Sequence, residues 1–396
     1  MNVMKSLLQY LFILLLLSVY FVGGFFQYFF GISSTLYSMF VLGLAYVISL
    51  LTIIYRKGKV TWSSIILISL FYLFLIITSG TINNTEPAKI VLYFVFPLVP
   101  LGVFLSIDGL NKVGINLKKL SSLFFKVLII IQLPIILIQK YGYDFLIRFN
   151  NSNQFIGDYD FMFGSFFLKA DHSLGFFLLI YLLATIFQYR KGVRKQMPWF
   201  LVGYICVTIL LLESNLTKLM FFIVLTYYGV IWANKKVRYS GVIAIFLVGY
   251  VMLNLALSVP KIQTELFFLK NKYTVSESVK AVERGYAKRP QIVISYLQES
   301  LKIIGEGPYD YFNLLTGEFK KAMNFSQLIW TYNDLGIIGI IVIVLLLFAI
   351  IKYLGLDRES RILLTFILLF YLFMTNVYYD IGMMLSIFVI VNQKIN

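Results

Sequence analysis

Residues 6–28 read SLLQYLFILLLLSVYFVGGFFQY, a largely apolar run close to the start of the chain. Because a helix satisfies its own backbone hydrogen bonds, about 20 such residues are enough to cross the roughly 30 Å hydrocarbon core of a membrane. The run is too long for the apolar part of a signal peptide, and it lacks a small-residue cleavage site. We therefore expect residues 6–28 to form a first membrane-spanning helix.

Comparable runs recur from this one to the end of the chain. The 396 residues are 60% hydrophobic and only 13% charged, whereas a soluble domain carries roughly a quarter charged residues. This composition excludes a soluble globular fold and predicts an all-α polytopic integral membrane protein. We expect twelve spans, or eleven if the short last run does not cross, at residues 6–28, 34–55, 61–79, 90–107, 120–139, 172–189, 198–214, 218–234, 240–257, 327–351, 362–378 and 381–392.

The basic residues indicate which way these spans run. If the N-terminus is cytoplasmic, every even-numbered connection between spans is basic, as the positive-inside rule requires. More than half of the 34 Lys and Arg residues then lie on the inner side: Arg56, Lys57, Lys59, Lys112, Lys118, Lys119, Arg190, Lys191, Arg194, Lys195, Lys235, Lys236, Arg238, Lys352, Arg358 and Arg361, with Lys5 and Lys394 at the two ends. The formal net charge of +16 therefore reflects topology, and we expect no nucleic-acid partner.

One connection on the outer side is much larger than the others. Residues 258–326 separate nine predicted spans in 1–257 from three in 327–396. Thr274 to Glu277 fits a helix capping box, and Gly285 is a stop signal. Pro290 opens a second stretch with apolar residues at helical spacing, which Gly305 ends. We expect an extracytoplasmic loop with two or three short amphipathic helices that lie on the membrane or cover the bundle.

Charged groups placed against a membrane are costly and are therefore functional candidates. Lys169, Asp171 and His172 open the sixth predicted span, and His172 is the only histidine of the chain. A lone histidine is more often a satisfied structural residue than a catalyst. An Asp–His neighbour pair at a membrane surface could instead take a proton from a hydroxyl group.

The other outer candidates are cations that suit a phosphate and carboxylates that suit acid–base chemistry. Lys218 is the last residue of the turn 213–218, where a plain loop salt bridge is the alternative. Arg284, Lys288 and Arg289 lie in or between the two loop helices, where solvated surface residues are the alternative. Glu306 and Asp310 follow the glycines of the segment 305–311, which fits a plain turn equally well. Two further polar groups favour a structural role: Asn324, Gln327, Asn333 and Asp334, and Tyr378, Tyr379 and Asp380.

Several functional classes lack their sequence signatures. The connections expected on the inner side contain no Walker motif, no Asp-x-Asp site for a nucleotide sugar and no metal-ligand spacing, so an ATP-driven pump and an enzyme of cytosolic nucleotide sugars are disfavoured. Cys206 is the only cysteine, which excludes an internal disulfide, and we interpret it as a small buried side chain. We expect no metal and no cofactor.

The order of these features resembles that of the Wzy-type O-antigen and capsular polysaccharide polymerases and of their relatives, the O-antigen ligases. A polar motif that opens a mid-chain span in the family is similar to residues 169–175, and the outer turn that follows it is similar to residues 214–218. A large outer loop with an arginine and a Gly-x-Gly element is matched by Arg289 and residues 305–307. The resemblance covers most of the chain in layout, through short motifs.

Two departures from the family pattern carry information. Lys218 stands where arginine is usual, which keeps the charge but loses bidentate recognition of phosphate. Met323 precedes Asn324 where family members often have a His-Asn pair, before the acidic residue Asp334 and the glycines that follow it. Ligases are thought to rely on such a histidine, so the departure favours a polymerase.

The resemblance implies a donor glycan on undecaprenyl pyrophosphate and an acceptor that is a lipid-linked repeat unit, both at the outer leaflet. The pyrophosphate would be held by residues among Arg289, Arg284, Lys218, Lys288, Lys169 and Asn324. The proton of the acceptor hydroxyl would go to one of His172, Asp171, Glu306 and Asp310.

This resemblance also implies a place in the cell. The protein would be a multi-pass protein of the bacterial cytoplasmic membrane with both termini inside, working beside a flippase and a chain-length regulator. The alternatives are a ligase-type glycan transferase, a flippase or other transporter of lipid-linked oligosaccharides, and a non-catalytic partner in an envelope assembly. Against a transporter, the two halves show no convincing repeat, and only Asp108 and Lys126 are charges that would lie deep.

Overall fold

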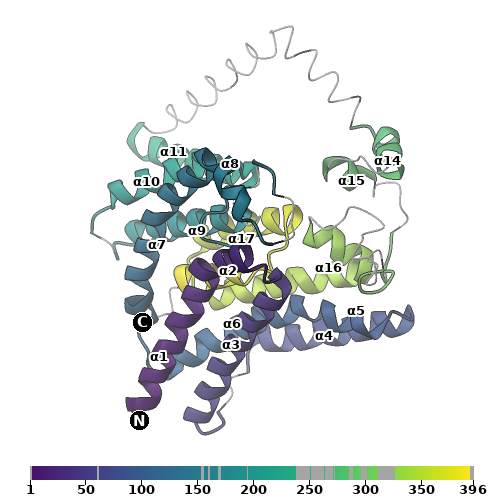
Figure 1. Ribbon diagram of the computed structural model, residues 1–396, viewed down its shortest axis with the longest axis horizontal. Coiled ribbons are helices and arrows are strands. Elements are labelled where there is room, and N and C mark those ends of the chain that lie inside the picture. The colour runs from purple at the N-terminus through teal and green to yellow at the C-terminus, as the bar shows by residue number, and fades with distance from the viewer. Residues whose placement is uncertain are drawn as a thin grey trace.

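The computed structural model describes residues 2–59, 62–152, 156–158, 161–167, 171–193, 195–237, 250, 263, 271, 273–284, 289–295, 301–310 and 326–392. Throughout these residues the regular structure is helical, without a β-strand. Figure 1 shows the helices gathered into one bundle. The prediction of an all-α fold is therefore confirmed.

Seven of the helices in the described ranges are long and apolar enough to cross a membrane. They are Val3–Phe30, Ser34–Tyr55, Ser64–Ile82, Pro87–Lys112, Leu117–Tyr141, His172–Arg190 and Gln327–Tyr353. Trp199–Leu211, Asn215–Val230 and Ile381–Val391 are shorter and also apolar. This set of helices is that of a membrane protein.

Helices occur at the predicted spans that the structure covers. The elements are α1 (Asn2–Leu17), η1 (Ser18–Val22), α2 (Gly23–Phe30), α3 (Ser34–Tyr55), α4 (Ser64–Ile82), α5 (Pro87–Tyr93), α6 (Val95–Lys112), α7 (Leu117–Tyr141), α8 (Tyr143–Leu146), η2 (Ile147–Phe149), α9 (Asp171–Arg190), α10 (Trp199–Leu211), α11 (Asn215–Val237), α14 (Val275–Glu283), α15 (Arg289–Ser295), α16 (Gln327–Tyr353), α17 (Arg358–Met374), α18 (Ile381–Leu385) and η5 (Ser386–Val391). Of the predicted ninth span, 240–257, all but residue 250 lies outside the described residues.

Short polar residues set where many of these helices begin. The side chains of Ser33, Ser63 and Asn116 accept hydrogen bonds from the first-turn backbone of α3, α4 and α7. Asp357 and Asp380 do the same for α17 and α18. Each cap satisfies a backbone N–H that has no partner inside its helix.

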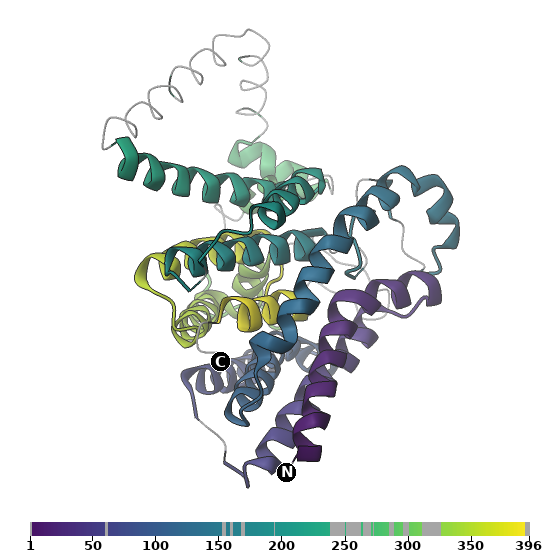
Figure 2. The ribbon, with the colours of Figure 1, turned by 90° about the vertical axis from the view of Figure 1, so that its left-hand side faces the viewer.

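Helix α9 lies at the centre of the bundle. Its side chains are buried almost all round from Leu174 to Thr185, as expected for a helix that is apolar on every face. It packs against η5, α10, α11 and α18, and a second layer pairs α3 with α6 and α16 with α4 and α17. Figures 1 and 2 show these neighbours around it.

Helix α16 is interrupted near its start, where one unbroken span was predicted. Gly336 has φ 66° and ψ −159°, a conformation that favours glycine. The segment 302–307 crosses the break: Glu306 N donates to Asn333 O over 2.8 Å, and Ile337 N donates to Lys302 O over 2.9 Å. The backbone groups that the break releases are therefore paired within the protein, as a low-dielectric setting requires.

The loop helices confirm one prediction and correct another. Helix α14 begins as the capping box predicted, with Thr274 accepting from Glu277 N. The second helix, expected to run to Gly305, is described from Arg289 to Ser295, and residues 301–304 are not helical. The reason is the crossing at α16: Lys302 N donates to the Tyr332 hydroxyl over 3.0 Å, which holds this segment extended across the helix.

The short loop helices cover one end of the bundle. Ile292 of α15 packs against Ile329 of α16 and against Phe373 of α17. Figures 1 and 2 place α14 and α15 at the opposite end of the molecule from the start of α1. Among the described residues, an apolar side chain of this loop helix is therefore buried together with one of α16.

Candidate functional site

His172 lies in the first turn of α9, against the turn that joins α10 to α11. Its ring Nδ1 is 2.7 Å from Ser214 Oγ, and the imidazole is half-buried. Ser214 also caps α11, because its Oγ accepts from Thr217 N over 3.4 Å. The structure thus joins two sequence candidates, the motif of His172 and the turn 213–218, by a direct hydrogen bond.

The hydrogen bonds continue from Ser214 into the core. Ser214 Oγ and Thr217 Oγ1 are 2.9 Å apart, and Thr217 Oγ1 is 2.9 Å from the hydroxyl of Tyr371 on α17. Gly175 makes this approach of α9 and α11 feasible, since a Cβ there would lie 2.2 Å from Thr217 Oγ1. A chain of four side chains, His172–Ser214–Thr217–Tyr371, therefore ties three helices together; we call it the outer chain.

Asp380 approaches the same place from the start of α18. Ser173, the residue after His172, donates its hydroxyl to Asp380 Oδ2, while Oδ1 accepts from Met383 N over 2.9 Å. Burial raises the pKa of the Asp380 carboxyl above its ordinary value, and the hydrogen bonds from Ser173 and Met383 oppose that rise. Asp380, interpreted from the sequence as structural, is thus one hydrogen bond from the neighbour of His172.

Lys218 is the cation closest to this chain in sequence. It is half-buried in the first turn of α11, and its ammonium group has no ion-pair partner among the residues that the structure describes. Glu213, the expected partner in a loop salt bridge, is exposed. A half-buried lysine without a carboxylate suits an anionic ligand.

The other predicted site residues divide into two groups. Glu306 and Asp310 are exposed, and Glu306 pairs with Lys302 over 2.8 Å, beside the break in α16 rather than beside His172. Arg284 is exposed at the end of α14. Outside the description lie the whole residues Lys169, Lys288 and Asn324 and the side chains of Asp171 and Arg289, of which only the helical backbone is given.

The glycines of residues 305–307 serve packing. A Cβ on Gly305 would lie 2.1 Å from the backbone carbon of Asp334, so only glycine allows the segment to approach α16 so closely. Gly307 has φ 98°, and its N–H donates to Asp334 O over 3.0 Å. These contacts give the motif a structural function in the fold.

Two apolar cavities lie at the expected outer ends of the helices. One of ≈560 Å³ is lined by α2, α7 and residues 161–165, including Phe25, Ile138 and Phe163. The other, ≈300 Å³, is lined by residues that include Tyr309, Trp330 and Tyr379, the residue before Asp380. Both could take an apolar chain near the polar site.

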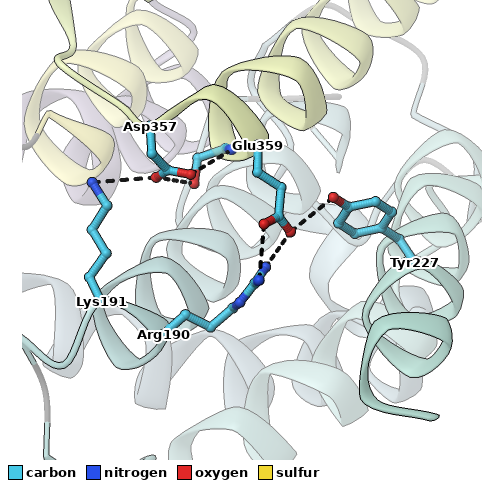
Figure 3. Close-up of polar contacts among 6 residues, drawn as sticks. Arg190, Lys191, Tyr227, Asp357 and Glu359 are labelled. Atoms are coloured by element: carbon cyan, nitrogen blue, oxygen red, sulfur yellow. Dashed lines mark hydrogen bonds and ion pairs between the residues drawn. The ribbon is translucent and has the colours of Figure 1, made fainter. Parts of the chain in front are cut away.

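A second polar cluster joins α9, α11 and α17 at the other end of α9 (Figure 3). Arg190 donates to both carboxylate oxygens of Glu359, which also accepts from the Tyr227 hydroxyl over 2.9 Å. Lys191 lies 3.3 Å from Asp357. We call these five residues the inner cluster, because their charges lie on the side expected to face the cytoplasm. Hydrogen bonding from Arg190 lowers the pKa of the Glu359 carboxyl.

Three residues in or beside the outer chain were not part of the site predicted from the sequence. They are Ser173, Tyr371 and Asp380. Serine and tyrosine are frequent in this chain, so nothing in the local pattern separates these two from other hydroxyls. Among the described residues, no group of three or more His, Cys, Asp and Glu side chains could hold a metal ion.

Comparison of the chain with protein-family models, with curated proteins and with solved structures finds no match in any of the three.

Proposed function

We propose that this protein is a glycan polymerase of the bacterial cytoplasmic membrane, which transfers a growing glycan from undecaprenyl pyrophosphate to a lipid-linked repeat unit at the outer leaflet. The observation that carries the proposal is the hydrogen bond from His172 to Ser214, with half-buried Lys218 one turn further along α11. A base and a cation at one membrane surface are the two groups that this transfer needs.

The geometry supports a specific role for His172. If Nδ1 donates its proton to Ser214 Oγ, the lone pair lies on Nε2, which then accepts a proton from the acceptor hydroxyl. The hydroxyl oxygen bonds to the anomeric carbon of the donor as the bond from that carbon to the pyrophosphate oxygen breaks. The leaving undecaprenyl pyrophosphate takes the electron pair of that bond, and His172 keeps the proton.

The cations and cavities supply the rest of the proposed site. Lys218 would stabilise the charge that builds on the departing pyrophosphate, and Arg284 and Arg289, at the end of α14 and the start of α15, are further candidates for this role. The apolar cavities beside α2 and beside Tyr379 suit the prenyl chains of donor and acceptor. Within this family the ligase reaction is the alternative, and the absence of a His-Asn pair at Met323 and Asn324 favours polymerisation.

Transport of a lipid-linked oligosaccharide is the second candidate. It is favoured by the break in α16 and by Asp334, which is completely buried next to it. Discontinuous helices with buried ionisable groups are typical of transporters. The two charges that the sequence placed deep in the membrane do not support transport further. Lys126 is exposed, and Asp108 pairs with Lys112.

Reconstitution in detergent distinguishes a polymerase from a transporter. Purified protein mixed with lipid-linked repeat units in detergent should produce a ladder of longer glycans, which gel electrophoresis resolves. Detergent abolishes any difference between two leaflets, so a transporter cannot produce the ladder. If substrate binding is demonstrated under the same conditions and no ladder forms, the polymerase proposal fails.

A further inference from the structure

Two neighbouring cavities that share several lining residues lie between α7, α9 and η5, at the end of the bundle that carries the inner cluster. The first, ≈160 Å³, is lined by residues that include Lys118, Gln188, Lys191 and Asn392. The second, ≈70 Å³, shares Lys118 and Gln188 and continues inward to Thr185. At about 30 Å³ for a liquid water, the first cavity alone has room for a group several times larger than one water molecule.

The charged side chains that line these two cavities are all positive among the described residues. Lys118 and Lys191 line the cavity, and the lining contains no carboxylate among the residues that the structure describes. Lys191 shares its charge with Asp357 at 3.3 Å (Figure 3). Lys118 has no ion-pair partner in the described part of the chain. The cavity therefore carries an excess of positive charge that favours an anion.

Uncharged donors in the wall point to the same conclusion. Thr185 is buried, with 3% of its surface exposed, yet its hydroxyl makes no hydrogen bond within the described ranges. A threonine inside a helix ordinarily bonds to the carbonyl one turn back. The half-buried amide of Gln188 is likewise without a hydrogen bond to the described residues. Neither polar group is sealed inside the protein, and both residues line the cavities, so a ligand there can form hydrogen bonds with them.

The third wall is unusual in its backbone. Residues 386–391 form a π-helix, and Val389 and Ile390 of this segment line both cavities. Short π-helical segments are rare and are found mostly at functional sites. Leu123 and Val127 of α7 are exposed and give this helix an apolar outer face that suits lipid.

We propose that this inner cavity binds the phosphate group of a phosphate ester, held by Lys118 and Lys191 and by hydrogen bonds from Thr185 and Gln188. The site is separate from the outer chain and does not depend on the proposed glycan transfer. Its position at the ends of three membrane helices suits the headgroup of an anionic phospholipid, while a soluble phosphate ester offers the same chemistry.

Native mass spectrometry of the purified full chain tests this inference with phosphatidylglycerol and, separately, with inorganic phosphate. Lys118→Gln should weaken binding about fivefold, the change that corresponds to about 1 kcal/mol for one lysine near an anionic headgroup. Lys119→Gln is the matched control, because Lys119 is the next residue and is exposed like Lys118, but lies outside the lining of both cavities. Thr185→Val should weaken binding about threefold without any change of charge.

Comparing phosphatidylglycerol with inorganic phosphate distinguishes a lipid headgroup from a soluble phosphate ester. Phosphatidylglycerol that stays bound in excess inorganic phosphate assigns the site to a lipid, and displacement by inorganic phosphate assigns it to a soluble ester. Equal effects of Lys118→Gln and Lys119→Gln would show diffuse surface attraction and overturn the proposal. So would the absence of binding by both ligands in protein that elutes as a folded, monodisperse species.

Discussion

The two ends of α9 are held in different ways. At the end of Arg190 the contacts are ion pairs between partly exposed side chains, with side-chain exposures of 30% for Arg190 and 36% for Glu359. At the end of His172 the contacts are hydrogen bonds between hydroxyls and an imidazole, and Ser214 and Thr217 are completely buried. The same helix is thus anchored to α11 and α17 by solvated charges at one end and by a dry polar chain at the other.

This difference between the two ends of α9 distinguishes contacts that hold helices together from contacts that we expect to serve catalysis. Partly exposed ion pairs contribute little free energy because water and salt screen them, but they fix which helices are neighbours. A buried chain of hydroxyls is harder to satisfy and can orient an imidazole and pass on changes of protonation. The inner cluster therefore fixes which helices are neighbours, while the outer chain is the part that we expect to function in catalysis.

The largest expected effect is on activity, and it should arise at the His172 end of α9 and not at the Arg190 end. His172→Ala should lower glycan polymerisation by about 10²–10⁴-fold, because a positioned base contributes about that much to proton transfer. Ladder formation by the purified variant measures the loss. Membrane abundance should stay near that of the parent protein.

Glu359→Gln is the matched control at the inner end. It should leave the polymerisation rate within about twofold, since an exposed ion pair has no contact with the outer chain. A His172→Ala protein that still builds ladders at the parent rate would remove the base from the proposed mechanism.

The second effect concerns stability. Thr217→Val keeps the shape of the side chain and removes the hydroxyl between Ser214 and Tyr371. Two buried hydroxyls then lose a partner, so we expect the free energy of unfolding to fall by about 1–3 kcal/mol. Thermal unfolding in detergent measures the change. Thr226→Val, at an exposed position of the same helix, should change it by less than about 0.5 kcal/mol; equal effects of both substitutions would contradict a special role of the buried chain.

The third effect is smaller and depends on pH. Arg190→Gln removes the guanidinium that lowers the pKa of Glu359, and we expect a loss of about 0–1 kcal/mol at neutral pH. Because the folded-state pKa is lowered, this stabilisation is present above the ordinary pKa of a glutamate and is lost as pH falls through the lowered value. Unfolding midpoints of the parent and variant should therefore converge in acid. High salt should reduce the difference as well, and a gap that persists at low pH would assign the effect to packing of the arginine stem.

Much of the layout could be predicted from the sequence because a membrane helix is a local structure. It satisfies its own backbone, so an apolar run such as 6–28 is sufficient to predict it. The capping box at Thr274 was equally readable, since its partners are three residues apart. His172 stood out because an ionisable group at the mouth of an apolar run is rare.

Contacts between helices could not be predicted in the same way. Arg190 and Glu359 are separated by 169 positions, and Ser173 and Asp380 by 207. In lipid the apolar faces do not distinguish one neighbouring helix from another, so pairing depends on small residues such as Gly175 and on single polar contacts. The break in α16 escaped prediction for the same reason, because the segment 302–307 that stabilises it belongs to another part of the chain.

The smallest expected effect tests the carboxylate at the edge of the outer chain. Burial raises the pKa of Asp380 in the folded protein, so ionising it there is less favourable than in the unfolded chain. The folded state is therefore penalised progressively as pH rises from the ordinary aspartate pKa through the raised one. Asp380→Asn keeps a helix-capping oxygen for Met383 N but cannot ionise.

The free energy of unfolding of Asp380→Asn should consequently fall less than that of the parent as pH rises over this interval. The expected difference between the two proteins is about 1 kcal/mol or less. Thermal unfolding at a series of pH values measures it. Asp357→Asn is the control of opposite sign: the hydrogen bonds from Ser360 and Lys191 outweigh burial and lower the pKa of Asp357. That variant should therefore lose stability relative to the parent above the ordinary carboxyl pKa and approach it in acid. Parallel pH profiles for the two substitutions would mean that the carboxylates at the two ends of α9 share one environment.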